Sequence, residues 1–111
     1  MKVREVAGIL EAEVCCDAGM SDGDISSVCA ADIMSDVIIY VREQPVLLTG
    51  LLDSQVLHTA EMMDIRCIVF VRGKKPDPSL TEQARAKNIT VLTTALSMYI
   101  ACGKLYAAGL R

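Results

Sequence analysis

The strongest constraint on the fold is a set of short, continuous apolar runs separated by longer amphipathic segments. The clearest run is CIVFV at 67–71, which stands between Arg66 and Arg72, and the runs at 45–50 and 89–94 have the same character. A strand that is buried on both faces cannot alternate polar with apolar residues. These runs therefore predict an α/β fold with three layers, α/β/α, around a largely parallel or mixed sheet of about five strands.

The segments between the runs carry apolar residues at helical spacing. The chain opens with such a segment, and an extended stretch, AEVCC, follows it. A loop rich in Gly, Ser and Asp spans 18–27 and leads into a strand near 25–30. Further helices are expected to begin at Asp53 or the next residue, and with Pro78 at the first helical position. The last helix is expected over 95–110, and the side chains that we expect it to turn inward are Leu96, Tyr99, Ile100, Gly103 and Leu105 or Tyr106.

Composition limits the class of protein. The 111 residues fit one domain, 1–111, and the 52% of hydrophobic and 23% of charged residues are typical of a folded chain. A net charge of -3 gives no electrostatic reason to bind nucleic acid or an anionic membrane. No apolar run approaches the roughly 20 residues that span a bilayer, and the first residues lack a signal-peptide pattern, so we expect a cytoplasmic protein.

Five cysteines are present, without a Cys-x-x-Cys pair or a second set of soft ligands at metal spacing. We therefore expect no disulfide framework, no metal ion and no cofactor. Cys29 and Cys67 lie in apolar runs and are interpreted as small core residues. The adjacent pair Cys15 and Cys16 leaves a thiol switch open as an alternative.

Polar residues follow the predicted strands at the edge where parallel sheets bind ligands, beside helix N-termini that attract anions. Such an edge suits a small polar or phosphorylated ligand, including a nucleotide. The neighbouring Ser54, Lys74, Lys75 and Ser97 belong to the same segments. The candidate ligand-binding residues are Asp32, Ser35, Asp36, Thr49, Gly50, Arg72, Gly73, Thr93 and Thr94.

Each of these side chains also has a structural explanation. Asp32 is expected to cap the helix that follows it, with Ser35 and Asp36 in the first turn, where negative charge meets free amides. Thr94 is expected to cap the last helix in the same way. For Asp32, Ser35 and Asp36 we expect the start of the helix to be the main role, and ligand binding the alternative.

No catalytic set is evident, so we expect that the protein is not an enzyme. The single histidine, His58, falls beside Leu57 in a predicted helix and is interpreted as a surface residue. The glycine-rich phosphate loop, the dinucleotide fingerprint and the hydrolase nucleophile motif are all absent from the sequence.

Four segments in one order, SDGDISSVCAADIMSDVI, VLLTGL, QVLHTAEMMDIRCIVFVRGKKPD and ITVLTTALSMYIACGKLY, resemble the DRTGG domain family over nearly the whole chain. The pattern Ser-Asp-x-x-Ser-Asp-Val matches the residues up to Val37, with Ala31 in place of the first serine. A later family pattern matches Cys67 to Asp77. The motif that names the family is only partly kept, at Asp22, Ile25 and Ser26.

This resemblance implies a three-layer α/β domain akin to the N-terminal domain of HPr kinase/phosphorylase, in a family that accompanies CBS domains and regulates rather than catalyses. Short free-standing relatives are similar and point to redox or hydrogenase systems. We therefore expect a non-catalytic regulatory module that binds a small ligand, a partner protein such as an enzyme or regulator, or both.

The alternative is a pure interaction module without a small ligand, most simply a homodimer. The mean hydropathy of the chain is +0.39, which means that it contains more apolar material than a protein of this size readily hides from its surface. The methionines available for such an interface are Met20, Met34, Met62, Met63 and Met98.

Overall fold

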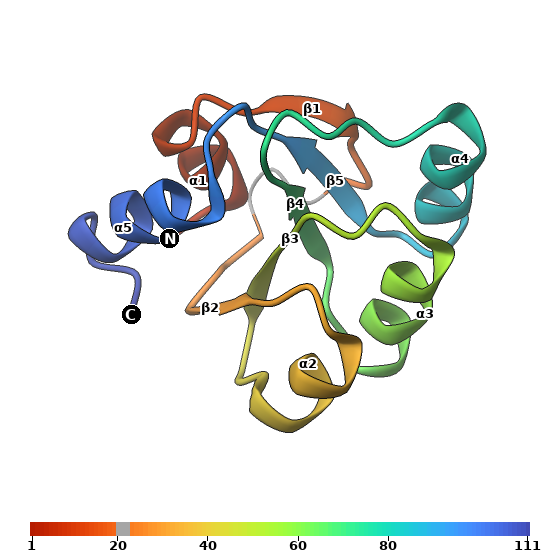
Figure 1. The fold of residues 1–111 in the computed structure, drawn as a ribbon, viewed down its shortest axis with the longest axis horizontal. Helices are drawn as coiled ribbons and strands as arrows, with labels where there is room; N and C mark the ends of the chain where they lie inside the picture. Colours follow the sequence, from red (N-terminus) through yellow and green to blue (C-terminus); the bar gives the residue numbers. More distant parts are fainter. Residues whose placement is uncertain (20–22) are drawn as a thin grey trace.

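The computed structural model describes residues 1–19 and 23–111, so Met20 and Asp22 lie outside the described residues. Helices and strands alternate along most of the chain (Figure 1). In order, the elements are α1 (Val3–Ile9), β1 (Glu13–Cys16), β2 (Ser27–Ala30), α2 (Met34–Tyr40), β3 (Pro45–Thr49), α3 (Ser54–Met62), β4 (Cys67–Phe70), α4 (Pro78–Ala86), β5 (Thr90–Thr93) and α5 (Met98–Ala107).

The strands form one five-stranded sheet in the order β1-β5-β4-β3-β2. The four strands β2 to β5 are parallel to one another, and β1 is antiparallel to β5. The sheet is therefore mixed, and the predicted α/β class with about five strands is confirmed. β2 and β1 are its two edge strands.

Helices cover both faces of the sheet. Figure 1 shows α2, α3 and α4 along one face and α1 with α5 on the other. Every residue of β3, β4 and β5 is buried. Alternate residues contribute to two separate apolar cores: Leu47, Ile68 and Phe70 to one, Leu48 and Val69 to the other. The three-layer arrangement follows from this burial on both faces.

Two predicted helix starts are confirmed. The Asp53 carboxylate accepts a hydrogen bond from the Gln55 N–H at 2.8 Å at the start of α3. Asp77 accepts from the Leu80 N–H at 2.8 Å at the start of α4, where Pro78 occupies the first position. Both carboxylates satisfy amides that have no partner within the helix.

The predictions for the last helix need two corrections. Ser97, rather than Thr94, caps α5, because the helix begins only at Met98 and Thr94 directly follows β5. The buried stripe consists of Ala101 and Leu105, four residues apart. Leu105 is buried and Leu96 is half-buried, as predicted. Tyr99, Ile100, Gly103 and Tyr106 are exposed instead, because the face of α5 that packs on the sheet runs through Ala101 and Leu105.

In the part of the chain that the structure describes, no helix combines the length and apolar character needed to cross a membrane.

The two-sided burial predicts that Leu48→Ala destabilises the fold by about 2–5 kcal/mol, because it opens a cavity in the core between the sheet and α1 with α5. The matched control is Val14→Ala on the exposed side of β1, with an expected change below about 1 kcal/mol. Urea unfolding at an unchanged m-value measures both. Equal effects for the two variants would contradict a core on this face.

Candidate functional site

The carboxyl ends of three neighbouring strands meet at Asp32, which follows β2. Its Oδ1 atom accepts hydrogen bonds from the Gly50 N–H at 2.7 Å and from the Thr49 hydroxyl at 3.3 Å, both at the end of β3. Its Oδ2 atom accepts from Arg72 Nη2 at 3.3 Å, after β4. One carboxylate thus joins its own loop to two others, at Gly50 and Arg72, which lie 18 and 40 residues further along the chain. We call Asp32, Thr49, Gly50 and Arg72 the Asp32 site.

The prediction that Asp32 caps the following helix is wrong. α2 begins at Met34, the capping position is occupied by Ile33, and no side chain accepts a hydrogen bond there. The Asp32 carboxylate turns to the buried residue Gly50 instead, because the Gly50 N–H needs an acceptor.

The other two members of the predicted cluster do not join the site. Asp36 lies in the first turn of α2, as predicted, and Ser35 is an exposed residue of the same turn. Asp36 lines a hollow at the open edge of β2 together with Cys29 and Tyr40. The structure therefore separates the sequence cluster into one residue at the strand ends and two on the helix.

Arg72 has an unusual backbone. Its φ angle is 61° and that of Gly73 is 70°, so both central residues of the turn from Val71 to Lys74 are left-handed, as in a type I′ turn. Within the described residues, the four other non-glycine residues with positive φ each lie in a segment that follows a helix, where such angles are common, and they are Glu11, Gln44, Asp64 and Asn88. Arg72 alone among them follows a strand, and left-handed angles are unfavourable for its side chain.

The loop after β5 holds this turn in place. The Arg72 N–H donates to the Leu96 carbonyl at 2.8 Å, and the Gly73 N–H donates to the Thr94 carbonyl at 2.8 Å. The Thr93 hydroxyl donates to the Lys74 carbonyl at 2.6 Å. Gly73 and Thr94 through their backbones, and Thr93 through its hydroxyl, therefore hold the turn that positions Arg72.

The hydroxyl of Thr94 has a separate structural task. It donates to the Leu10 carbonyl at 2.7 Å in a buried position and so ties the end of α1 to the end of β5. Thr94 and Thr93 are both buried. Neither hydroxyl hydrogen is available to a ligand.

Gly50 makes room for the guanidinium of Arg72. A Cβ atom at position 50 would overlap Arg72 Nη2 and lie 2.7 Å from Arg72 Cζ. Such a distance is far below van der Waals contact, so an alanine would displace the end of the arginine side chain. The sequence signal for this role is a glycine directly after a buried strand, but the partner that approaches it is 22 residues away and belongs to another loop.

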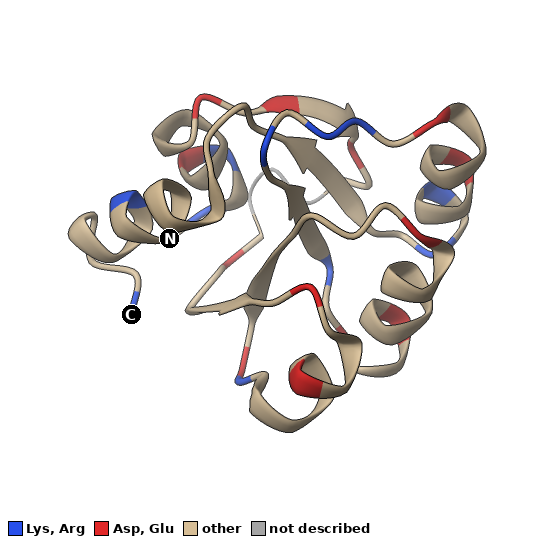
Figure 2. Cartoon of the chain, in the orientation of Figure 1, with Lys and Arg blue, Asp and Glu red and all other residues tan. Residues whose placement is uncertain are grey.

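The site combines a fixed carboxylate with an accessible cation. The Gly50 N–H, and after it Arg72, lower the pKa of Asp32 below its ordinary value, so the carboxylate is charged near neutral pH. The side chains of Arg72 and Asp32 are 42% and 46% exposed. The segment after β4 is the blue stretch at the top of Figure 2 and continues to Lys74 and Lys75, of which Lys75 pairs with Glu13 at 3.1 Å.

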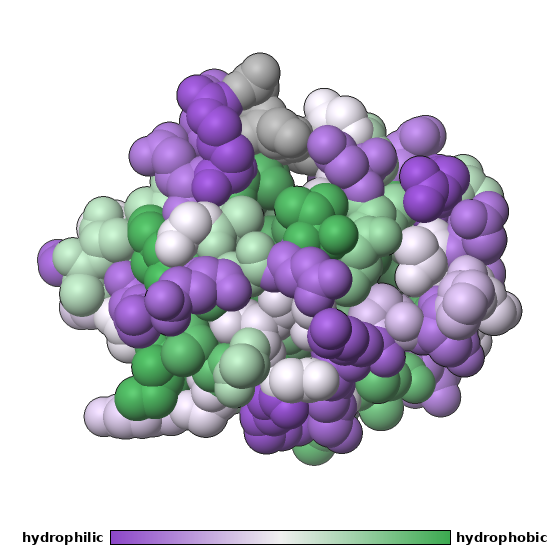
Figure 3. All heavy atoms as spheres, turned by 90° about the horizontal axis from the view of Figure 1, so that it is seen from above, coloured by the Kyte–Doolittle hydropathy of each residue, from purple (hydrophilic) through white to green (hydrophobic). Residues whose placement is uncertain are grey.

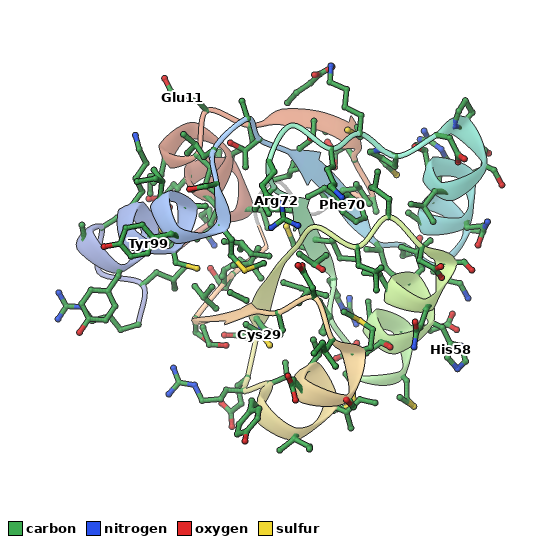
Figure 4. The ribbon with its side chains drawn as sticks, viewed as in Figure 1. Glu11, Cys29, His58, Phe70, Arg72 and Tyr99 are labelled. Atoms are coloured by element: carbon green, nitrogen blue, oxygen red, sulfur yellow. The ribbon has the colours of Figure 1, made fainter. Side chains whose placement is uncertain are left out.

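Figure 4 shows Arg72 near the upper ends of the central strands, while His58 projects from the outer side of α3. His58 is exposed, as predicted. Figure 3 shows the molecule from the side toward which β3 and β4 run, where hydrophilic side chains surround separate apolar patches. Because His58 lies on the outer side of α3, it is not placed to act as a base beside Arg72.

A second opening lies nearby, between the starts of α3 and α4. This cleft of about 450 Å³ is lined by Ser54, Lys75 and Gln83, among others. Asp53 and Asp77 also line it, and their carboxylates already accept hydrogen bonds from backbone amides at the starts of the two helices. Two carboxylates against one paired lysine make the cleft a poor anion site.

The thiols do not form a reactive centre. Cys16, Cys29 and Cys67 are buried, and burial raises the pKa of Cys67 to about 12. Burial, and after it the charge of Glu13, raises the pKa of Cys15. The raised pKa of Cys15 disfavours the thiolate that a switch at this residue needs. Across residues 1–19 and 23–111, no three His, Cys, Asp or Glu side chains are grouped to hold a metal ion.

A family model described as the DRTGG domain matches residues 5–106. The chain belongs to the DRTGG domain family. The resemblance in the sequence is thereby confirmed over nearly its full extent. A comparison with curated proteins found no significant match.

Among solved structures, this DRTGG domain is similar to the CBS and DRTGG domains of the regulatory region of Clostridium perfringens pyrophosphatase, a crystal structure in complex with the activator diadenosine tetraphosphate. The TM-score is 0.74 at 16% sequence identity, over 94% of this chain and 45% of that one. The chain thus spans less than half of that region. At this identity the likeness is one of fold.

The Asp32 site predicts a pH-dependent contribution to the stability of the DRTGG domain. A carboxyl group whose pKa is lowered on folding stabilises the folded state above its unfolded pKa, near 3.8, and loses this contribution as the pH falls through the folded value. We expect Asp32→Ala to cost about 1 kcal/mol at pH 7, a modest value because the pair is half exposed. Asp32→Asn should cost less, since its amide oxygen can still accept from Gly50.

Chemical unfolding between pH 2 and pH 7 checks this expectation. The stability difference between wild type and Asp32→Asn should be constant above about pH 5 and shrink below about pH 4. A difference that persists unchanged at pH 2 would show that the charge of Asp32 does not contribute.

The contact between Gly50 and Arg72 predicts a coupled pair. Gly50→Ala should displace the guanidinium and cost about 1 kcal/mol, whereas the same change in an Arg72→Ala background should be nearly neutral because the new methyl group then has space. A double-mutant cycle by thermal or urea unfolding gives the coupling energy. Additive effects would mean that the two residues do not interact.

Proposed function

We propose that this chain is a regulatory module that binds an anionic small ligand, of the nucleotide or polyphosphate class, beside Arg72. The conformation of Arg72 carries the proposal. A left-handed non-glycine residue costs on the order of 1 kcal/mol, and glycine would form the same turn without this cost. Strained residues gather at functional sites, so the side chain of Arg72 has a use that offsets the strain.

The geometry of the guanidinium supports an oxyanion as the ligand. A guanidinium has about five N–H donors in a planar fork, which match the oxygens of a phosphate group. Among the described residues, the Arg72 guanidinium has one hydrogen-bond partner, Asp32, on Nη2. Asp32 orients the group, and the exposed remainder of the fork is free to face a phosphate.

The regulatory character is proposed from the family and from the chemistry of the site. The similar pyrophosphatase region is regulatory and was solved with a nucleotide activator. An ionised Asp32 with a lowered pKa and an arginine are poorly suited to exchange protons near pH 7. Binding a ligand, rather than transforming it, is therefore the role we propose, with the chain acting as one domain over 1–111.

A second candidate is an interaction module that docks a partner enzyme or a second copy of the chain. The observation that favours it is the exposure of large apolar side chains on two helices. On α2, Ile39 is 69% and Tyr40 is 71% exposed, and on α5 Tyr99 is 83% exposed. Isolated apolar residues are normal on a surface, but groups of them mark interfaces. The predicted link with redox systems and the cytoplasmic location stay predictions from the sequence.

Thermal-shift measurements test the ligand hypothesis with ATP, diadenosine tetraphosphate and pyrophosphate as probes. A ligand at 100 times its Kd stabilises the fold by about 2.7 kcal/mol, which raises the Tm by on the order of 10 °C. Arg72→Ala and Gly50→Ala should abolish the shift. Arg66→Ala is the control, because Arg66 is an exposed arginine that pairs with Asp64 before β4.

A panel without any shift in the wild-type protein would argue against this ligand class. A shift that survives Arg72→Ala would place the ligand elsewhere on the molecule.

A further inference from the structure

One edge of the sheet is open. The Ala31 N–H donates to the Leu48 carbonyl at 3.1 Å, toward β3. Because alternate residues of a parallel strand bond to the same neighbour, Cys29 and Ala31 face β3, while Val28 and Ala30 direct their N–H and C=O groups outward. In the described part of the chain, no strand pairs with the outer side of β2.

The two edges of the sheet differ in their protection. At the other edge, β1 contains a register shift between Val14 and Cys16, and Glu13 on this strand pairs with Lys75. Bulges and charged side chains are common devices that prevent pairing at an edge. β2 has a regular register with β3 and the sequence Ser-Val-Cys-Ala, without a charge or a proline. The edge of β2 is therefore the one suited to pair with another strand.

We propose that β2 pairs with β2 of a second copy of this chain, antiparallel about a twofold axis, so that two sheets become one. This inference rests on the second candidate function and specifies its surface. Antiparallel pairing with Val28 opposite Ala30 satisfies the outward N–H and C=O groups of both residues in both copies. In the proposed register Cys29 lies opposite Cys29 on the axis.

The charges along this edge are self-complementary. Asp36 begins α2 near the carboxyl end of β2 and lines a hollow of about 290 Å³ with Val28 to Ala31 and Tyr40. Arg42 follows α2 near the amino end of β2 and lines a second hollow with Ser27 and Glu43. Arg111 lines the second hollow too, and its main-chain oxygen accepts a hydrogen bond from Arg42 Nη2 at 2.8 Å, which holds the Arg42 guanidinium at this end of β2.

Antiparallel pairing brings the Asp36 end of one copy against the Arg42 end of the other, twice in the dimer. It also covers the exposed apolar side chain of Tyr40 on α2, which lines the same hollow as Asp36 beside β2. Figure 4 shows Cys29 on β2 beside α2, so the paired strands and the paired helices lie on the same side of the molecule. Charge and apolar surface therefore favour the same partner, a second copy.

Charge reversal tests the orientation. The wild-type protein should have twice the 12.0 kDa mass of one chain in light scattering at micromolar concentration. Asp36→Arg or Arg42→Asp alone places like charges in contact and should shift the protein to monomer, with at least a tenfold higher dissociation constant. The double variant should restore the dimer. Glu82→Arg is the matched control, because it reverses an exposed charge on α4, which packs near β1 and β5.

Two further measurements address the strand itself. Ala30→Pro removes an outward N–H that has no partner among residues 1–19 and 23–111, so it should abolish the dimer while the melting transition stays cooperative. Oxidation of the wild type by copper phenanthroline, which takes up the two electrons of the thiol pair, should link Cys29 to Cys29, because facing Cα atoms in such pairs lie about 4.5 Å apart. Cys29→Ser should remove this link, and peptide mapping identifies it.

A monomeric wild type, or a dimer that survives both single reversals and Ala30→Pro, would overturn the proposal. A double variant that stays monomeric would overturn the antiparallel pairing of Asp36 with Arg42. Thermal shifts with ATP in the Asp36→Arg variant separate this result from the ligand hypothesis, because Arg72 and Asp32 are intact there.

Discussion

Burial of the three central strands on both faces governs the whole structure. Every residue of β3, β4 and β5 is buried, and their side chains alternate between two apolar cores. Backbone groups of such strands must be paired with neighbouring strands, because no water reaches them. Parallel neighbours in turn need helices as connections, which cover the faces and bring all the carboxyl ends to one side.

That shared side of the sheet is where the unusual chemistry of the chain is found. Asp32, Gly50 and Arg72 follow the carboxyl ends of three adjacent strands. The Asp32 carboxylate joins them, because it accepts hydrogen bonds from Thr49, Gly50 and Arg72. The backbone of Arg72 is strained, and its turn is held by carbonyls of the loop after β5. A polar network at a rim of a rigid apolar sheet is held more accurately than one on free loops.

The proposed interaction surface arises from the same constraint in another direction. A sheet that is not closed must leave two edges, and unpaired edge groups invite pairing. β1 is shielded by its register shift and by the Glu13–Lys75 ion pair, whereas β2 has neither. Asp32 directly follows this open strand region, so a ligand at Arg72 and a partner at β2 would lie close to the same loop.

The sequence by itself determined the α/β class, the approximate positions of the strands, the caps at Asp53 and Asp77, and the family, because buried runs and helix starts are local patterns. It also indicated which strand ends carry polar residues. The order of the strands in the sheet is not a local property, so the sequence did not reveal it. Only the tertiary structure decided that the Asp32 carboxylate binds Gly50 and Arg72, and that the Thr94 hydroxyl donates to the Leu10 carbonyl. A side chain near a helix start has several partners within reach, and the choice between its own helix and a neighbouring strand depends on which buried amide lacks an acceptor.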